Sequence, residues 1–177
     1  MSRRARAAAR ELPPEESKLV ELPNGVRHPP PLRAAAFLGL VKAGETLARG
    51  LDADLQTAHG LSLRTFEVLL HLAAFSADGS LRMSALGEQA PLSQSRVSRL
   101  VAELEAKGLV AKEAAPDDSR GVVVHITDKG LQRLLEVQNT HFASLEDRFF
   151  SHLDWEEIVQ LGRITSRLIE AQVSRRG

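Results

Sequence analysis

The chain has 177 residues, of which 43% are hydrophobic and 26% are charged, so we expect one domain with a sizeable core, or two weakly separated lobes. Its 23 lysines and arginines balance 23 aspartates and glutamates. Overall charge therefore does not indicate a nucleic-acid or membrane partner, and a polyanion would need a local positive field. The chain contains no cysteine, which excludes a disulfide framework, a thiolate metal site and a cysteine-based redox switch.

The first 30 residues differ in composition from the rest of the chain. Five of the eight prolines lie there among charged residues, which predicts a mostly irregular arm with room for a short helix near residues 5–12. The paired arginines of MSRRARAAAR are followed by ELPPEESK rather than by the apolar core of an export signal. The most apolar run, AAAFLGLV at residues 34–41, is too short to span a bilayer. We therefore expect a cytoplasmic protein.

Two amphipathic helices are predicted after the arm. Apolar residues recur every three or four positions between Phe37 and Leu55, and Gly60 suits the end of that helix. Ser62 suits the N-cap of the next helix. Its apolar stripe consists of Leu63, Phe66, Leu69, Leu70 and Ala73. The segment SADGS, residues 76–80, ends this second helix.

The middle of the chain has the element order of a winged helix-turn-helix. A short helix near residues 84–90 is followed by Pro91 and by an amphipathic segment that Gly108 ends. Two short strands, residues 109–113 and 122–127, then flank the eight-residue loop AAPDDSRG. The apolar stripe of the amphipathic segment consists of Val97, Leu100, Val101 and Leu104, at i, i+3, i+4 and i+7. We therefore predict a mainly α-helical fold with a small β-hairpin wing.

The last 50 residues are predicted to form two long helices. Apolar residues between Leu131 and Phe149 follow a spacing of 4, 3, 4, 3, 4, with Gln138 in the series, which is nearly a heptad seam. The sequence DWEE opens the last helix, where Asp154 and Glu157 form a capping box. A lone winged-helix lobe cannot cover these apolar faces, so we expect an obligate dimer.

The outward face of the segment that contains Val97 carries the side chains suited to DNA. At about 100° per residue, Ser95, Ser98 and Arg99 point away from the apolar stripe. Acids appear only at its far end, at Glu103 and Glu105. The residues that we expect to reach bases and phosphates in a major groove are Ser93, Gln94, Ser95, Arg96 and Arg99. The alternative is an ordinary solvated face.

The loop between the two predicted strands carries one more arginine, Arg120. An isolated arginine near the tip of such a projection suits insertion into a narrow minor groove. Asp118 could position the Arg120 guanidinium through a bidentate ion pair. The alternative is a surface turn held by a local ion pair.

These residues resemble the MarR family of transcriptional regulators. DSRGVVVHIT, residues 118–127, fits the wing signature D-x-R-x-x-x-V-x-[LI]-T of that family, and DKG follows it. LSQSRVSRLVAELEAKGLV, residues 92–110, is similar to the family's recognition helix and its exit into the wing. The resemblance covers about residues 32–173, and the arm lies outside it.

The resemblance implies a dimer whose recognition helices enter successive major grooves of a palindromic site. It implies a first dimerisation helix at 31–60, a DNA-binding lobe at 61–127 and C-terminal dimerisation helices at 128–177, which follow the irregular arm at residues 1–30 that the composition predicts. It further implies an effector, commonly a small aromatic acid, held between the dimerisation helices and the DNA lobe. Phe66 and His71 could line that pocket, although His71 also suits an ordinary core or surface position.

The sequence contains no Gly-rich phosphate loop, nucleophile elbow or acid pair, so we expect no enzyme. The scattered histidines lack metal-ligand spacing, and we expect neither a metal nor a cofactor. The predicted function is a DNA-binding transcriptional regulator, a repressor, released by a ligand. The alternative is a winged-helix module that contacts only proteins. That alternative favours acids or bulky apolar residues in place of Arg96, Arg99 and Arg120, and the chain keeps all three.

Overall fold

The computed structural model describes residues 13, 16, 18–76, 78–89, 93–115 and 118–173, with the backbone alone at residues 88, 89, 118–120 and 173. The chain divides into two compact units, Met1–Leu47 and Ala48–Gly177. The long helix α3 (Pro31–His59) contributes residues to both units. Among the described residues, no helix is long and apolar enough to cross a membrane.

A small hairpin precedes α3. Its strands β1 (Val20–Glu21) and β2 (Arg27–His28) pair antiparallel. The Gly25 amide donates to the Leu22 carbonyl (2.9 Å), and Gly25 has a φ of 79°, a conformation that favours glycine. The prediction of an irregular arm is therefore wrong for residues 20–28. The turn signal Asn24-Gly25 lies between two segments in which apolar and polar residues alternate, and it outweighs the effect of the prolines.

The helix α3 begins at a proline and ends at a glycine, in line with the sequence. Pro31 occupies the first helical position, where its missing N–H costs nothing. Gly60 follows the last turn with a φ of 61°, and its amide donates to the Gln56 carbonyl (2.9 Å). Leu51 and Leu55, in the second half of α3, are buried. This half of the helix therefore packs into the larger unit.

The core of the larger unit forms around α4 (Leu63–Ala74). Ser62 is its N-cap, and the serine hydroxyl accepts from the Thr65 amide (3.1 Å). Phe66 and Leu69 are at most 1% exposed. The apolar core continues onto the neighbouring helices and strands through Leu86, Val97, Val101, Leu104, Val124, Leu134 and Val137. Of the predicted stripe of α4, Leu63, Phe66 and Leu69 are buried and Leu70 and Ala73 are half-buried, while Val68 and Leu72 are buried without having been predicted.

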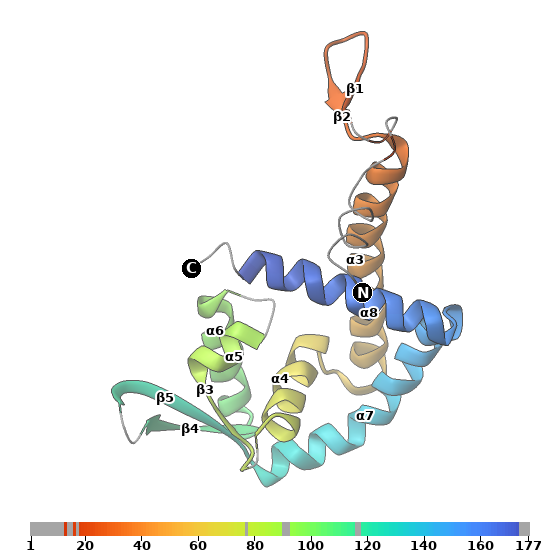
Figure 1. The fold of residues 1–177 in the computed structure, drawn as a ribbon. Coiled ribbons are helices and arrows are strands. Elements are labelled where there is room, and N and C mark those ends of the chain that lie inside the picture. Colours follow the sequence, from red (N-terminus) through yellow and green to blue (C-terminus); the bar gives the residue numbers. More distant parts are fainter. Residues whose placement is uncertain are drawn as a thin grey trace, which may run out of the picture. The chain divides into compact units, whose positions relative to one another are not determined.

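The wing belongs to a three-stranded sheet of order β3-β5-β4. Its strands are β3 (Ser80–Arg82), β4 (Val110–Ala115) and β5 (Asp118–Ile126), and Figure 1 shows β4 and β5 projecting beyond the helices. The eight-residue loop predicted between the last two strands is wrong, because the ladder continues into the alanines of β4. Ala114 pairs with Val122 and Ala115 with Asp118, across a register irregularity that absorbs the extra residues.

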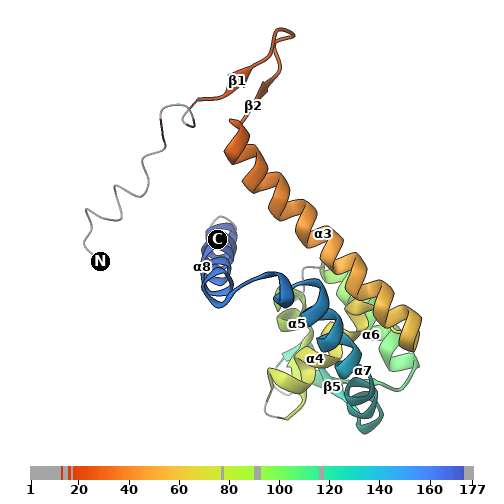
Figure 2. The same ribbon diagram turned by 90° about the vertical axis from the view of Figure 1, so that its right-hand side faces the viewer.

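Two helices precede the wing, α5 (Met83–Gln89) and α6 (Gln94–Ala106), and they contact each other, as Figure 1 and Figure 2 show. Gly108 ends α6 with a φ of 71°, and the Leu109 amide donates to the Leu104 carbonyl (2.9 Å). This is the left-handed cap that the sequence predicts. The sequence does not predict the strand β3, because SADGS, which ends at Ser80, is typical of a turn.

The chain closes with α7 (Asp128–Arg148), the 3₁₀ turn η1 (Phe150–His152) and α8 (Trp155–Val173). The Asp154 carboxylate accepts from the Glu157 amide, and the Glu157 carboxylate accepts from the Asp154 amide, both at 2.9 Å. The predicted capping box is confirmed. Mainly helical elements with a small antiparallel wing make the fold a winged helix-turn-helix with long terminal helices.

Candidate nucleic-acid interface

The helix α6 separates an apolar face from a polar one. Val97, Val101 and Leu104 are at most 1% exposed, and Leu100 is half-buried. This burial fixes the rotation of the helix, because its other face must then point to solvent. The side chains exposed there are Ser93, Gln94, Ser95, Arg96, Ser98, Arg99 and Ala102. The structure therefore brings together the five predicted DNA-contacting residues of this helix.

Arg96 and Arg99 are the two cations of this face. Neither guanidinium group forms a hydrogen bond or ion pair with another described residue, so both retain their donors for a ligand. The small side chains of Ser95, Ser98 and Ala102 stand beside them. Such a face lets a helix approach a polyanion closely and still offer hydrogen-bond donors.

Gln94 differs from the two arginines in having a partner within the protein. Its Nε2 atom donates to the Met83 carbonyl (3.4 Å), and its side chain lies over Gly87, so it holds the start of α6 against α5. Ser93 and Ser95 also interact, with 3.2 Å between their hydroxyl oxygens. The sequence offered no sign of these contacts, and Gln94 must release Met83 before it can contact a base.

The acids of α6 lie at its C-terminal end. Glu105 forms an ion pair with Lys112 of β4 (2.7 Å), and Glu103 is exposed. Lys129, at the start of α7, donates to the Lys107 carbonyl (2.7 Å) at the end of α6. The negative charge of α6 thus lies at its C-terminal end, next to β4 and the start of α7. The N-terminal half, which carries Arg96 and Arg99, keeps a local positive field.

The wing residues are placed by their backbone. Asp118 and Arg120 belong to β5, close to the turn between β4 and β5, and their side chains lie outside the described part of the structure. The predicted ion pair between them therefore stays a prediction. Arg82, at the exposed end of β3, is a further cation of this sheet that the sequence did not single out. The three residues SLR, which contain Arg82, are too short a run to predict a strand, so the sequence offers no reason to place Arg82 in the sheet.

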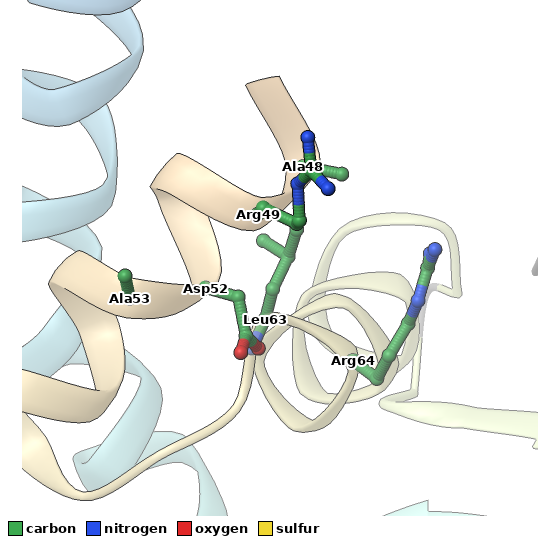
Figure 3. A pocket seen from close by; sticks show the side chains of 6 residues that line it. All are labelled: Ala48, Arg49, Asp52, Ala53, Leu63 and Arg64. Carbon is green, nitrogen blue, oxygen red and sulfur yellow. The ribbon is translucent and has the colours of Figure 1, made fainter. Parts of the chain in front are cut away.

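A small open pocket lies between the second half of α3 and the start of α4, with a volume of about 270 Å³. Figure 3 shows Arg49 and Arg64 standing on its rim, while the Asp52 carboxylate accepts from the Leu63 amide (2.8 Å). Arg64 also pairs with Glu67 (2.7 Å). The lining residues are Ala48, Arg49, Asp52, Ala53, Leu63 and Arg64. The wall of the pocket thus combines two cations and one carboxylate with apolar groups.

Phe66 and His71, which the sequence suggested for a pocket, lie elsewhere on α4. Phe66 is buried against His141 of α7, with 4.3 Å between ring centroids. The Nδ1 atom of His71 lies 2.6 Å from the Glu67 carbonyl, and its ring lies near that of Phe75. Burial lowers the pKa of His141, while the charge of Glu67 opposes that shift. Neither Phe66 nor His71 lines the pocket of Figure 3.

Comparison with known proteins agrees with this geometry. The model of the MarR family matches residues 59–121. The transcriptional repressor MdtR of Bacillus subtilis is 32% identical over 103 residues, which cover 58% of this chain and 66% of MdtR, about two thirds of its length. The transcriptional regulator MhqR of the same organism is 30% identical over 110 residues, which cover 62% of this chain and 73% of MhqR.

Solved structures extend the similarity to most of the chain. Sco3205, a MarR family regulator from Streptomyces coelicolor solved in complex with DNA, matches with a TM-score of 0.77 at 29% identity. That match covers 82% of this chain and 91% of Sco3205. AbsC, of the same family and organism, matches with a TM-score of 0.78 at 27% identity over 84% of this chain and 99% of AbsC. The chain therefore belongs to the MarR family of winged-helix transcriptional regulators.

Proposed function

We propose that this protein binds a specific DNA duplex through the exposed face of α6. The observation that carries the proposal is the placement of Arg96 and Arg99. Both are exposed among small polar side chains, without a partner among the described residues, while the apolar stripe fixes the face outward. Sco3205, which shares this fold, was solved with DNA bound. On this proposal Ser93, Gln94 and Ser95 contact bases or phosphates, and Arg120 enters the minor groove beside them.

We further propose that the protein acts as a homodimer on a palindromic site. Three apolar side chains of α7 are 41–52% exposed, namely Leu131, Leu135 and Phe142. On α8, Trp155 is 76% exposed, although a tryptophan at the start of a helix is normally at least partly covered. A second copy would remove these surfaces from water. Two recognition helices related by a two-fold axis would then match a two-fold repeat in the DNA.

The regulatory sign that we propose is repression relieved by a small aromatic carboxylate. MdtR, a relative of similar sequence, is a repressor. The site that we propose for this ligand is the pocket between α3 and α4, where Arg64 would exchange Glu67 for the ligand carboxylate and Ala53 and Leu63 would contact the ring. A volume of about 270 Å³ is sufficient for a single ring with short substituents.

Selection of bound duplexes from a random pool tests the DNA-binding proposal directly. We expect an enriched motif with two-fold symmetry and half-sites about one helical turn, roughly 10 base pairs, apart. A variant with Arg96→Glu and Arg99→Glu serves as the matched control, since both side chains are exposed and the fold should survive. A pool that enriches no motif with the parent protein, or the same motif with the control, would refute sequence-specific binding through α6.

A further inference from the structure

The hairpin before α3 is amphipathic, and its two faces follow from its register. Val20 pairs with His28 and Glu21 with Arg27, and the Leu22 amide donates to the Val26 carbonyl (2.8 Å). Directly opposed residues of an antiparallel pair share a face. Alternation therefore places Val20, Leu22 and Val26 on one side of the hairpin together with His28, and we call the three apolar side chains the hairpin face. The opposed charges Glu21 and Arg27 stand on the other side.

Among the described residues of its own unit, none covers the hairpin face. Of the described residues in Met1–Leu47, only Pro30 is buried. Val20, Leu22 and Val26 are 38%, 40% and 53% exposed. A two-stranded hairpin of this size is marginal in water without an apolar surface to pack on. The turn at Asn24-Gly25 determines the shape of the hairpin. Its exposed hairpin face, however, is stabilised only when another apolar surface covers it.

The exposed apolar surface of this unit extends beyond the hairpin face onto the first half of α3. The first half of α3 adds to the hairpin face and to Leu19 the exposed side chains Leu32, Phe37, Leu38, Leu40 and Val41. These nine side chains, 38–69% exposed, present roughly 500 Å² of apolar area. A standard interface buries about 800 Å² on each partner. The unit therefore carries more than half of what a stable dimer needs.

We propose that the hairpin face docks on a second copy of this chain and clamps the dimer. The proposal rests on the homodimer proposed above and extends it to residues 19–28. A second copy supplies the matching chemistry, because α8 exposes Trp155, Ile164, Leu168 and Ile169. DNA fits the face less well, since the three side chains are apolar and Glu21 opposes the one arginine of the hairpin.

The absence of cysteine permits a direct test by photocrosslinking in the full chain. Val26→Cys and Arg27→Cys, labelled with a benzophenone maleimide, place the probe on the hairpin face and on the opposite side. Isotopically heavy and light chains are mixed before irradiation. We expect heavy–light crosslinks from position 26 at several times the yield from position 27. Crosslinks within one chain, equal yields from both positions, or crosslinks to added duplex DNA would each overturn the proposal.

Sedimentation separates this proposal from the dimer on which it rests. Leu22→Glu with Val26→Glu should raise the dimer dissociation constant at least about tenfold, because each dimer loses both of its docked hairpins. Glu21→Gln with Arg27→Gln, on the opposite face, should leave it within about twofold. A parent protein that remains monomeric refutes the homodimer and the clamp together. A parent dimer whose dissociation constant the first pair leaves unchanged refutes the clamp alone.

Discussion

Asp54 of α3 and Arg148 of α7 are joined by two parallel charge-assisted hydrogen bonds. The Nε atom of Arg148 lies 2.7 Å from Oδ2 of Asp54, and Nη2 lies 2.8 Å from Oδ1. Ser144 donates a further hydrogen bond to the same carboxylate. The guanidinium lies over Gly50, where an added Cβ would come within 2.7 Å of it. The pair thus joins the first and last parts of the larger unit at a position where α3 lacks a side chain.

Asp54→Asn should weaken this junction, most visibly at neutral pH. Hydrogen bonds from Arg148 and then Ser144 hold the pKa of Asp54 below its ordinary value of 3.8. A carboxylate with a lowered pKa stabilises the fold above its ordinary value, and the contribution is lost as pH falls through the lowered one. The pair is partly exposed and screened, so we expect the Tm to fall by only about 1–3 °C at pH 7. The difference from the parent should shrink below pH 3.8.

The measurement is thermal unfolding of both proteins between pH 2.5 and 7. Glu146→Gln is the control, because Glu146 is exposed on the same helix and forms no side-chain hydrogen bond or ion pair with another described residue. A constant difference in Tm across that pH range would show that the charge of Asp54 contributes nothing.

Gly130→Ala should destabilise the protein although alanine favours helices. A Cβ at Gly130 would lie 2.0 Å from the Leu109 carbonyl oxygen and 3.0 Å from Ile126. Backbone at that distance cannot move aside, so the start of α7 must shift, at a cost of about 1–3 kcal/mol. Helix propensity alone predicts the opposite sign, a gain of about 1 kcal/mol. Urea unfolding distinguishes the two, and an increase in unfolding free energy would refute the close packing at this site.

The elements predicted from the sequence are those whose cause is local. Ser62 caps α4, Gly108 ends α6, and Asp154 with Glu157 begins α8, and each depends on backbone chemistry within a few residues. The burial of Val97 and its neighbours followed from helical period alone. The burial of this apolar stripe also turns the polar face of α6 towards solvent.

The elements that the sequence did not predict depend on distant partners. The strand β3 exists because Leu81 pairs with Val124, more than 40 positions later. The tether from Gln94 to Met83 depends on how α5 meets α6, and no spacing rule foretells it. The hairpin at residues 20–28 is a different case, because the sequence does contain a local signal for its turn, Asn24-Gly25. The prolines on both sides of that signal favour an irregular segment, and the prediction followed the prolines.

Arg99→Ala should weaken binding to the selected duplex by about 1–3 kcal/mol per subunit and, if Arg99 contacts a base, relax preference at one position in each half-site. Both subunits lose the contact, so even 1.4 kcal/mol each would approach a hundredfold loss of affinity. Arg167→Ala, which removes an exposed charge from α8, is the matched control. Titration at one fixed salt concentration measures both, because phosphate contacts make affinities depend on salt. Equal affinities for Arg99→Ala and the parent would remove Arg99 from the interface.

Arg120→Ala should weaken binding by a similar amount but change a different preference. The minor groove offers little beyond its width and A·T content, so the bias of the flanks towards A·T should flatten while the major-groove preferences persist. Asp118→Ala should act as a weaker version of the same change, because the arginine remains but loses the partner that we predict for it. Each variant is titrated against the selected duplex and against duplexes with G·C-rich flanks. A loss of affinity that is equal for all flanks would assign Arg120 to phosphate contacts, and parental binding by both Arg99→Ala and Arg120→Ala would reject DNA binding through this face.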